Sequence, residues 1–296
     1  MPCSLGDYQV HRAREGFCSI RQISSGEIMH SRTDPMEEAR KIYIEQSNLR
    51  GRLREKLATE EALVLWDVGL GAAANAMAAI ECYEKVEETR PLRIISFEND
   101  LDSLQLALQH KKDFPYLRAD ATAAILADGR WQSGKYAGLS WALCPGDFID
   151  NIKRAPAPDV IFYDMFSTKS SSRLWSAATF RQLFEACAGR AVEVFTYTCS
   201  TANRAALLAA GFYVARGRNA GEKLETTIAF TPAARRRLNA AQRDLLEEDW
   251  LAKWNRSTAK FPTDVAQEER QVFEKIILNH QQFGKSAQPE RLLSNT

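Results

Sequence analysis

The residue best placed to do chemistry in this sequence is Asp164, which directly follows the apolar segment Val160–Tyr163. An apolar strand would deliver its side chain to the carboxyl edge of a sheet, where open α/β sheets bind their ligands. A carboxylate buried there is costly unless something pairs with it, and an amine substrate would be a suitable partner. Asp164 is therefore our candidate catalytic residue, which would orient an amine and take up or stabilise its proton. The alternative is that Asp164 only bonds the backbone of a nearby turn.

A candidate cofactor cradle is the sequence Asp67-Val-Gly69-Leu-Gly71, which follows the apolar run Leu63–Trp66. A buried strand that leads into a tight turn and a helix is typical of nucleotide and cofactor sites. Glycine is needed where the backbone approaches a ligand closely, because a Cβ would collide with it. An ordinary strand-to-helix turn is the alternative. The nicotinamide fingerprint would have a third glycine at position 74, where this chain has Ala74.

Two further carboxylates could hold an adenosine. Glu98 ends the segment Leu92–Phe97, about 20 to 30 residues after the glycine turn, where an acid can bind both ribose hydroxyls. Nicotinamide cofactors and S-adenosylmethionine both contain such a ribose. Asp147 follows the apolar segment Leu139–Leu143 and could accept a hydrogen bond from an adenine amino group, or instead cap the next helix. Asp120 is a competing candidate for the adenine contact.

A parallel sheet is needed to bring these residues together, and the sequence predicts one. Apolar segments alternate with helical patterns, which favours a sheet covered by helices on both faces. The predicted strands lie at residues 63–68, 92–97, 139–143, 159–164 and 191–197. Two later segments, Phe212–Arg216 and Thr226–Phe230, are so close in sequence that they should pair as an antiparallel hairpin. This pattern is typical of Rossmann-like class I S-adenosylmethionine-dependent methyltransferases, whereas nicotinamide domains continue with another parallel crossover.

Both ends of the sequence predict additions to this α/β core. Residues 7–30 suggest a small β-hairpin with a Ser-Gly turn at Ser24–Gly26, and Asp34-Pro35 should open a helix that runs to about Glu45. Residues 231–296 predict two helices separated by Pro262. We therefore expect an N-terminal hairpin and helix over residues 1–60, a methyltransferase domain over 61–230, and a helical extension over 231–296.

Composition excludes several other classes of protein. The 39 basic and 38 acidic residues give a net charge of +1, so any nucleic-acid surface must be a local patch. We expect such a patch around the closing hairpin and the segment after it, from Arg204, Arg216, Arg218, Lys223 and Arg235–Arg237. The six cysteines and four histidines have no metal-ligand spacing, and no metal site is expected. No membrane-spanning run, Gly-x-Ser-x-Gly elbow or P-loop occurs, which favours a cytoplasmic protein that is neither a hydrolase nor a phosphoryl transferase.

Several motifs in the sequence resemble the MnmC-like methyltransferase family, which contains the methyltransferase domain of the tRNA 5-methylaminomethyl-2-thiouridine biosynthesis enzyme and its stand-alone relatives. The resemblance covers roughly residues 15–230. The matching motifs are Gly26-Glu27-Ile-Met-His30-Ser31, Glu38-Ala39, Asp67-Val-Gly69-Leu-Gly71-Ala-Ala73-Ala-Asn75, Asp164 with Phe166 and Trp175, Phe195-Thr-Tyr-Thr198, and Gly221-Glu-Lys223-Leu-Glu225.

The resemblance implies that S-adenosylmethionine donates a methyl group to the aminomethyl nitrogen of a tRNA wobble uridine. It places Asp164 at the position of the family's catalytic carboxylate. Cofactor-binding roles are then expected for Asp67, Gly69, Gly71, Asn75, Glu98 and Asp147, and substrate-binding roles for Phe166, Lys169, Trp175 and Lys223. The expected partners are tRNA and a separate flavin-dependent or other enzyme that forms the aminomethyl group.

This chain departs from the family pattern at two places. Ala73 replaces the third glycine of the turn, which should be tolerated if its backbone φ is negative. Most of the loop after Asp164 is also substituted, so the acceptor could differ. A methyltransferase for a small amine or another acceptor is therefore one alternative. A non-catalytic scaffold and, more distantly, a dehydrogenase are the others.

Overall fold

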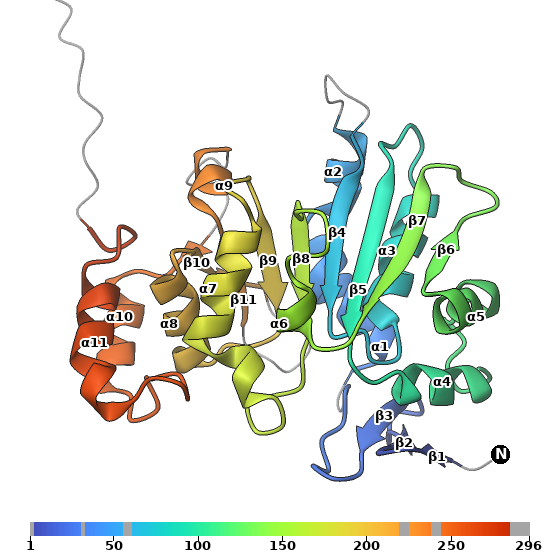
Figure 1. The fold of residues 1–296 in the computed structure, drawn as a ribbon, viewed down its shortest axis with the longest axis horizontal. Coiled ribbons are helices and arrows are strands. Elements are labelled where there is room, and N and C mark those ends of the chain that lie inside the picture. The colour runs from blue at the N-terminus through green and yellow to red at the C-terminus, as the bar shows by residue number, and fades with distance from the viewer. Residues whose placement is uncertain (1–2, 31–32, 56–60, 219–224, 238–243, 285–296) are drawn as a thin grey trace, which may run out of the picture.

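A computed structural model describes residues 3–30, 33–55, 61–218, 225–237 and 244–284 of the chain. In these residues the central feature is a sheet of nine strands in the order β12-β10-β11-β9-β8-β4-β5-β7-β6 (Figure 1). The strands are β4 (Leu63–Val68), β5 (Leu92–Glu98), β6 (Arg130–Gln132), β7 (Leu139–Pro145), β8 (Val160–Tyr163), β9 (Glu193–Thr196), β10 (Tyr213–Gly217), β11 (Thr226–Phe230) and β12 (Asp244–Leu245).

The predicted Rossmann-like methyltransferase sheet is confirmed. Strands β7, β5, β4, β8 and β9 are parallel neighbours, and β10 and β11 form the expected antiparallel hairpin. The hairpin joins the sheet through β11, which pairs antiparallel with β9. The short antiparallel edge strands β6 and β12 were not predicted, because two or three residues carry too little alternation to be recognised.

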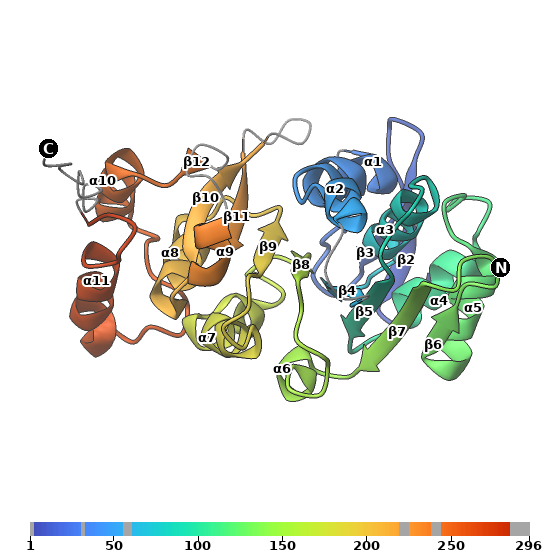
Figure 2. The ribbon, with the colours of Figure 1, turned by 90° about the horizontal axis from the view of Figure 1, so that it is seen from above.

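The central strands are buried on both faces, because their alternate residues enter two separate cores. Leu65 of β4 and Phe162 of β8 face one core, while Trp66 and Ile161 face the other. The first core is covered by α1 (Pro35–Ala39), the π-helical turn η1 (Arg40–Glu45), α2 (Leu49–Arg54), α3 (Ala74–Glu84), α4 (Asp102–Gln109) and α5 (Ala119–Asp128). The second is covered by α6 (Phe148–Asn151), α7 (Ala177–Ala186) and α8 (Thr201–Ala210). Figure 2 shows α1 to α3 on one side of the sheet and α6 and α7 on the other.

The N-terminal segment forms an antiparallel sheet of β1 (Ser4–Leu5), β2 (Tyr8–Arg12) and β3 (Cys18–Gln22). This sheet lies below the arrowheads of β4 and β5 in Figure 1, at the carboxyl edge of the main sheet. The predicted hairpin is therefore present, but the connection between β2 and β3 is residues 13–17. The Ser24–Gly26 turn lies after β3 and folds the chain back, so that Arg21 and Ile28 form an isolated antiparallel bridge.

The predicted helix start at Asp34 is confirmed, since its carboxylate accepts hydrogen bonds from the backbone nitrogens of Met36 at 2.9 Å and Glu37 at 3.1 Å. The helix continues to Glu45 as predicted, with its second half in π-helical form. Within the described residues, no helix is long and apolar enough to cross a membrane.

The C-terminal helices pack on the far end of the second core, beside α8 (Figure 1). They are α10 (Glu248–Arg256) and α11 (Arg270–Leu278), preceded by the short helix α9 (Pro232–Arg237) and joined through the 3-10 turn η4 (Gln267–Glu269). Trp250, Trp254, Phe273 and Ile277 are buried there. The helical extension is thus confirmed, while the division of the chain into three domains stays a prediction.

Ala73, at the start of α3, has a left-handed backbone conformation with φ 62° and ψ 23°. The condition under which alanine would be harmless here, a negative φ, is therefore not met. A left-handed conformation costs a residue with a Cβ roughly 1–2 kcal/mol. The chain thus retains the backbone shape of a glycine turn while carrying a residue that is strained in it.

We predict that Ala73→Gly destabilises the protein about 2 kcal/mol less than the matched variant Ala76→Gly. Both alanines are fully buried, so both variants lose the same methyl group. Ala76 lies inside helix α3, where glycine costs about 1 kcal/mol, whereas glycine at position 73 relieves the left-handed strain. Urea unfolding of the two variants measures the difference. Equal losses would show that Ala73 is not strained.

Candidate active site

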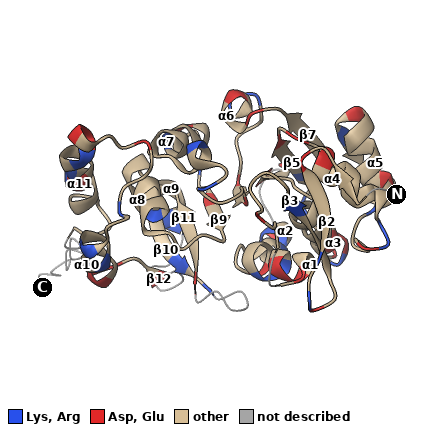
Figure 3. Ribbon diagram, turned by 90° about the horizontal axis from the view of Figure 1, so that it is seen from below, with Lys and Arg blue, Asp and Glu red and all other residues tan. Residues whose placement is uncertain are grey.

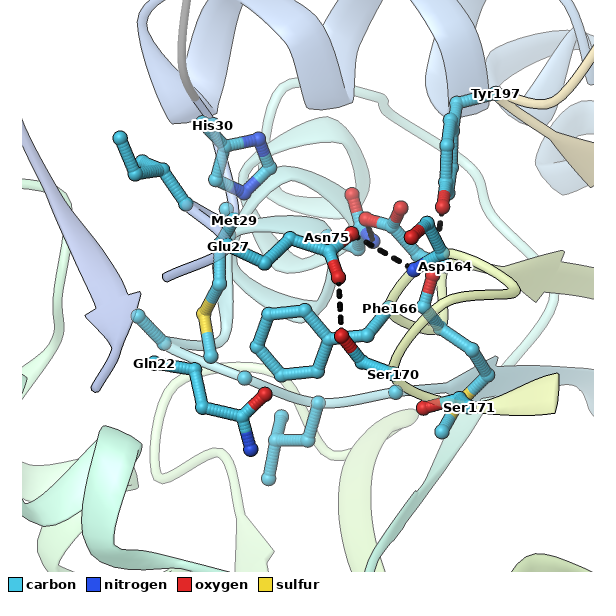
Figure 4. Close-up of a pocket in the computed structure, with 18 of the residues that line it drawn as sticks. Gln22, Glu27, Met29, His30, Asn75, Asp164, Phe166, Ser170, Ser171 and Tyr197 are labelled. Atoms are coloured by element: carbon cyan, nitrogen blue, oxygen red, sulfur yellow. Dashed lines mark hydrogen bonds between the residues drawn. The ribbon is translucent and has the colours of Figure 1, made fainter. Parts of the chain in front are cut away.

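A cavity of about 630 Å³ lies at the carboxyl edge of β4, β5 and β8. Its walls come from the N-terminal segment, the glycine turn after β4, the end of β5, the loop after β8 and Tyr197 (Figure 4). In parallel α/β sheets this is where ligands bind, because the chain leaves a crevice between strands whose connections run in opposite directions. The structure thus brings Gly69, Gly71, Asn75, Glu98 and Asp164 together in one cavity, as the sequence predicted.

The two glycines of the turn are required by close packing. Gly69 has φ +92°, and a Cβ added to it would lie 2.6 Å from the backbone oxygen of Asp164. Gly71 has φ +50°, and a Cβ there would lie 3.0 Å from the sulfur of Met29. Glycine therefore lets the end of β4 approach both the end of β8 and the N-terminal segment.

Glu98 ties the glycine turn to the end of β5. One carboxylate oxygen accepts a hydrogen bond from the backbone nitrogen of Gly71 at 3.1 Å, and the other accepts from Asn99 at 2.9 Å and Asp100 at 3.3 Å. Burial raises the pKa of Glu98, and these backbone donors oppose the rise. The carboxylate is thus held at the cavity wall in a fixed orientation.

Asn75 joins the start of α3 to Asp164, because its amide nitrogen donates a hydrogen bond of 2.8 Å to that carboxylate. Its own amide oxygen is buried and has no hydrogen-bond partner. Asp67 lies behind the turn: one of its oxygens accepts from the Ser96 hydroxyl at 2.7 Å, and the other is also buried without a partner. Neither of these two oxygens is accessible, and Asp67 is not among the described residues that line the cavity, so Asp67 supports the glycine turn from behind.

The cavity is strongly acidic. Glu27, Glu38, Glu98 and Asp164 line it, together with His30, and no lysine or arginine is found among its described lining residues. Burial raises the pKa of Asp164, His30 lowers it, and Glu38 raises it further. A cavity with this charge favours a cationic ligand over an anionic one.

His30 and Glu38 were not predicted as site residues. The structure places both in the cavity wall, with His30 Nδ1 3.3 Å from a Glu38 carboxylate oxygen. Tyr43 and Tyr197 lie beside them, and the pKa of each is raised by burial and by the neighbouring Asp164 carboxylate. The only sequence signal was the resemblance of the Gly26–Ser31 and Glu38-Ala39 segments to family motifs.

The predicted substrate residues occupy different environments. Phe166 lines the cavity, whereas Lys169 is exposed and is absent from the cavity lining. Trp175 is only 1% exposed and donates a hydrogen bond from its indole nitrogen to the backbone oxygen of Phe166 at 2.6 Å. Its position favours a role in supporting the loop over direct contact with a substrate. Lys223 lies outside the described residues.

The predicted adenine contacts also lie away from the cavity lining. Asp147 caps α6 by accepting from the Ile149 backbone nitrogen at 2.8 Å, and it forms an ion pair of 2.8 Å with Arg173. This is the capping alternative considered from the sequence. Asp120 is exposed in the first turn of α5. The adenine contact of Asp147 stays a prediction.

The predicted basic patch is wrong in part. Arg204 has only 1% of its side chain exposed and is held by Glu225, Thr226 and Thr227, so it cannot meet a phosphate at the surface. Arg216 is paired with Asp244, Asp249 and Glu225. In Figure 3 basic and acidic residues are interspersed over the helices. Arg218, Arg236 and Arg237 are exposed.

We predict that the free energy of unfolding decreases between about pH 4 and pH 7 more steeply in the wild-type protein than in Asp67→Asn. Burial raises the pKa of Asp67 from 3.8 to about 7. The native state therefore binds more protons than the unfolded state in this range, so stability is lost as the pH rises. Across this pH range, the difference in unfolding free energy between the wild type and Asp67→Asn should change by up to about 4 kcal/mol. Chemical unfolding across the range measures it, and parallel curves would show that Asp67 does not carry this shift.

Known proteins resemble this chain in both sequence and structure. Residues 130–232 match a family model described as S-adenosyl-L-methionine-dependent methyltransferase. The bifunctional tRNA 5-methylaminomethyl-2-thiouridine biosynthesis protein MnmC of Stutzerimonas stutzeri is 24% identical over 78% of this chain and 35% of its own length. The corresponding protein of Actinobacillus pleuropneumoniae serotype 5b is 26% identical over 67% of this chain and 31% of its own. The chain thus spans about a third of the length of these relatives.

The crystal structure of MnmC2 from Aquifex aeolicus has the same fold, with a TM-score of 0.65 and 20% sequence identity over 94% of this chain and 85% of that one. This similarity includes the parallel sheet that forms the cavity. Taken together, the family model, the sequence matches and the shared fold show that the chain is similar to S-adenosyl-L-methionine-dependent methyltransferases and resembles MnmC.

Proposed function

We propose that this enzyme is an N-methyltransferase that acts on the aminomethyl group of a tRNA wobble uridine. The observation that supports this most directly is the buried carboxylate of Asp164 in a cavity lined by acids and by no described lysine or arginine. An amine acceptor suits that environment, whereas a carboxylate or phosphate acceptor would be repelled. The names of the sequence relatives supply the tRNA context.

The site residues fit the cofactor. S-adenosylmethionine carries a positively charged sulfonium, an ammonium and a ribose with two hydroxyls, and when bound it supplies an electrophilic methyl group. Glu98 would accept from the ribose hydroxyls, and Gly69 and Gly71 would border the methionine end with their backbone. Asn75 would lie beside the methionine end, and Asp67 would support the glycine turn from behind it. Asp147 would contact the adenine if the adjoining loop allows it.

Asp164 would orient the acceptor and stabilise the positive charge of its amine. Asn75 fixes the carboxylate by donating to one of its oxygens, and Asp164 lines the cavity that an acceptor would enter. Because burial raises its pKa, Asp164 is also a better proton acceptor than an exposed aspartate. The chain therefore supplies placement, charge and a proton-binding group, which are the main needs of methyl transfer.

Transfer RNA would reach this cavity with only its modified base, since no lysine or arginine is among the described residues that line it. Phosphate contacts would come from exposed basic residues outside it, such as Lys169 and Arg173 on the loop after Asp164. The enzyme would act in the cytoplasm, after a separate enzyme has formed the aminomethyl group. Phe166 would contact the base from the cavity wall.

A small amine is the second candidate acceptor, and the loop after Asp164 favours it. In this chain Ser167 and Ser170 are bonded to Glu27, so the loop presents short polar groups in the stretch that departs from the family pattern. Methylation of small amines with no activity on tRNA would select this candidate.

We predict that tRNA from cells lacking this protein carries an aminomethyl wobble uridine without its terminal methyl group. The wild-type gene should restore the methyl group, and Asp164→Asn should lower the methylation rate by about 10²–10⁴-fold, because it removes the charge and the proton acceptor. Nucleoside mass analysis of total tRNA measures both effects.

Asp150→Asn is the matched control, because Asp150 is exposed on α6 and outside the cavity lining. It should restore methylation as well as the wild type. Unchanged wobble nucleosides in the deletion strain would contradict the tRNA assignment, and full activity of Asp164→Asn would contradict the role of Asp164.

A further inference from the structure

Glu27 links the N-terminal segment to the loop that follows Asp164. Its carboxylate accepts a hydrogen bond of 2.8 Å from the backbone nitrogen of Ser167 and one of 2.6 Å from the Ser170 hydroxyl. Figure 4 shows this contact beside the Phe166 ring, with Glu27 reaching over the cavity to Ser170. Glu27 belongs to the sequence motif Gly26–Ser31, which by itself predicts no role for this residue.

The loop after Asp164 is held at three successive backbone positions. The Tyr197 hydroxyl donates to the backbone oxygen of Met165 at 2.9 Å, and the Trp175 indole donates to that of Phe166 at 2.6 Å. The third position is the Ser167 nitrogen, which is bonded by Glu27. Tyr197 directly follows β9, and Trp175 ends a 3-10 turn, Ser172–Trp175. The third hydrogen bond comes from Glu27, which lies 140 residues before Ser167 in the chain.

Glu27 is itself in a fixed position. Its backbone oxygen accepts from the Gln22 nitrogen at 2.8 Å, and the neighbouring residue Ile28 bridges to Arg21. Two residues further on, the Met29 nitrogen bonds to the Ile20 oxygen at 3.0 Å. The carboxylate therefore acts from a tightly hydrogen-bonded turn, and hydrogen bonds to an ionised acceptor are about twice as strong as neutral ones.

We propose that Glu27 is a positioning residue that sets the conformation of the acceptor loop, Met165–Ser170, and so controls acceptor binding. The proposal rests on the proposed function in that this loop is taken to receive the acceptor. The cofactor end of the cavity is built by other residues, Gly69 to Asn75 and Glu98. Loss of Glu27 therefore weakens acceptor binding while the cofactor end stays intact.

The test compares Glu27→Ala and Glu27→Gln with the control Glu37→Gln, whose carboxylate is exposed on α1 and pairs with Lys41. Hydrogen exchange in peptides that cover residues 165–171 should quicken roughly tenfold in Glu27→Ala, because the Ser167 nitrogen loses a charged acceptor. Glu27→Gln keeps one acceptor oxygen and should be intermediate. Glu37→Gln should match the wild type.

Two further measurements separate positioning from a general loss of structure. In Glu27→Ala the affinity for S-adenosylhomocysteine, measured by calorimetry, should change less than about twofold. The second measurement uses tRNA from cells lacking the protein as substrate: its KM should rise roughly tenfold, with a smaller change in kcat. Ser170→Ala, which removes one of the two bonds, should show a smaller rise in KM.

Unchanged hydrogen exchange in residues 165–171 of Glu27→Ala would overturn the proposal. So would a loss of S-adenosylhomocysteine affinity and of thermal stability in this variant as large as its loss of acceptor binding. A KM equal to that of the wild type would overturn it as well. If the wild-type enzyme methylates no tRNA, the proposed function fails, but the exchange and the S-adenosylhomocysteine measurements still decide whether Glu27 positions the loop.

Discussion

The hydrogen bond between Asn75 and Asp164 is the interaction on which the rest of the site depends. It connects the first turn of α3 to the end of β8, across the gap that the glycine turn bridges. The backbone must pass so close to Asp164 that a Cβ on Gly69 would lie 2.6 Å from its carbonyl oxygen. The glycine turn, the helix start and the Asp164 carboxylate therefore form one packed unit. A change in any of them moves the others.

Charge is the second constraint. The cavity concentrates the carboxylates of Glu27, Glu38, Glu98 and Asp164 around His30. Such an arrangement is unfavourable in the free protein and becomes favourable when a cation enters. The N-terminal segment contributes to it from outside the main sheet, because Glu27, His30 and Glu38 complete the wall. This segment thus belongs to the active site as much as the glycine turn does.

The sequence predicted the sheet and its ligand edge well, because long apolar segments have a clear period and glycines mark the turn. Asp67, Gly69, Glu98 and Asp164 could be found because each directly follows or ends such a segment. His30 and Glu38 could not be placed, since their role depends on a segment that folds back over the sheet edge. The burial of Trp175 and Arg204 could not be predicted from the sequence either, because distant parts of the chain cover these side chains and decide whether they can contact a ligand.

We expect the acidic cavity to hold a cationic, adenosine-containing cofactor. Titration calorimetry tests this directly, with S-adenosylmethionine and NAD as ligands and with the wild type and Glu98→Ala as proteins. We expect S-adenosylmethionine to bind and NAD not to bind. In Glu98→Ala the affinity for S-adenosylmethionine should fall roughly tenfold or more through the lost ribose contacts. Binding of NAD in preference to S-adenosylmethionine, or an affinity for S-adenosylmethionine unchanged by Glu98→Ala, would contradict it.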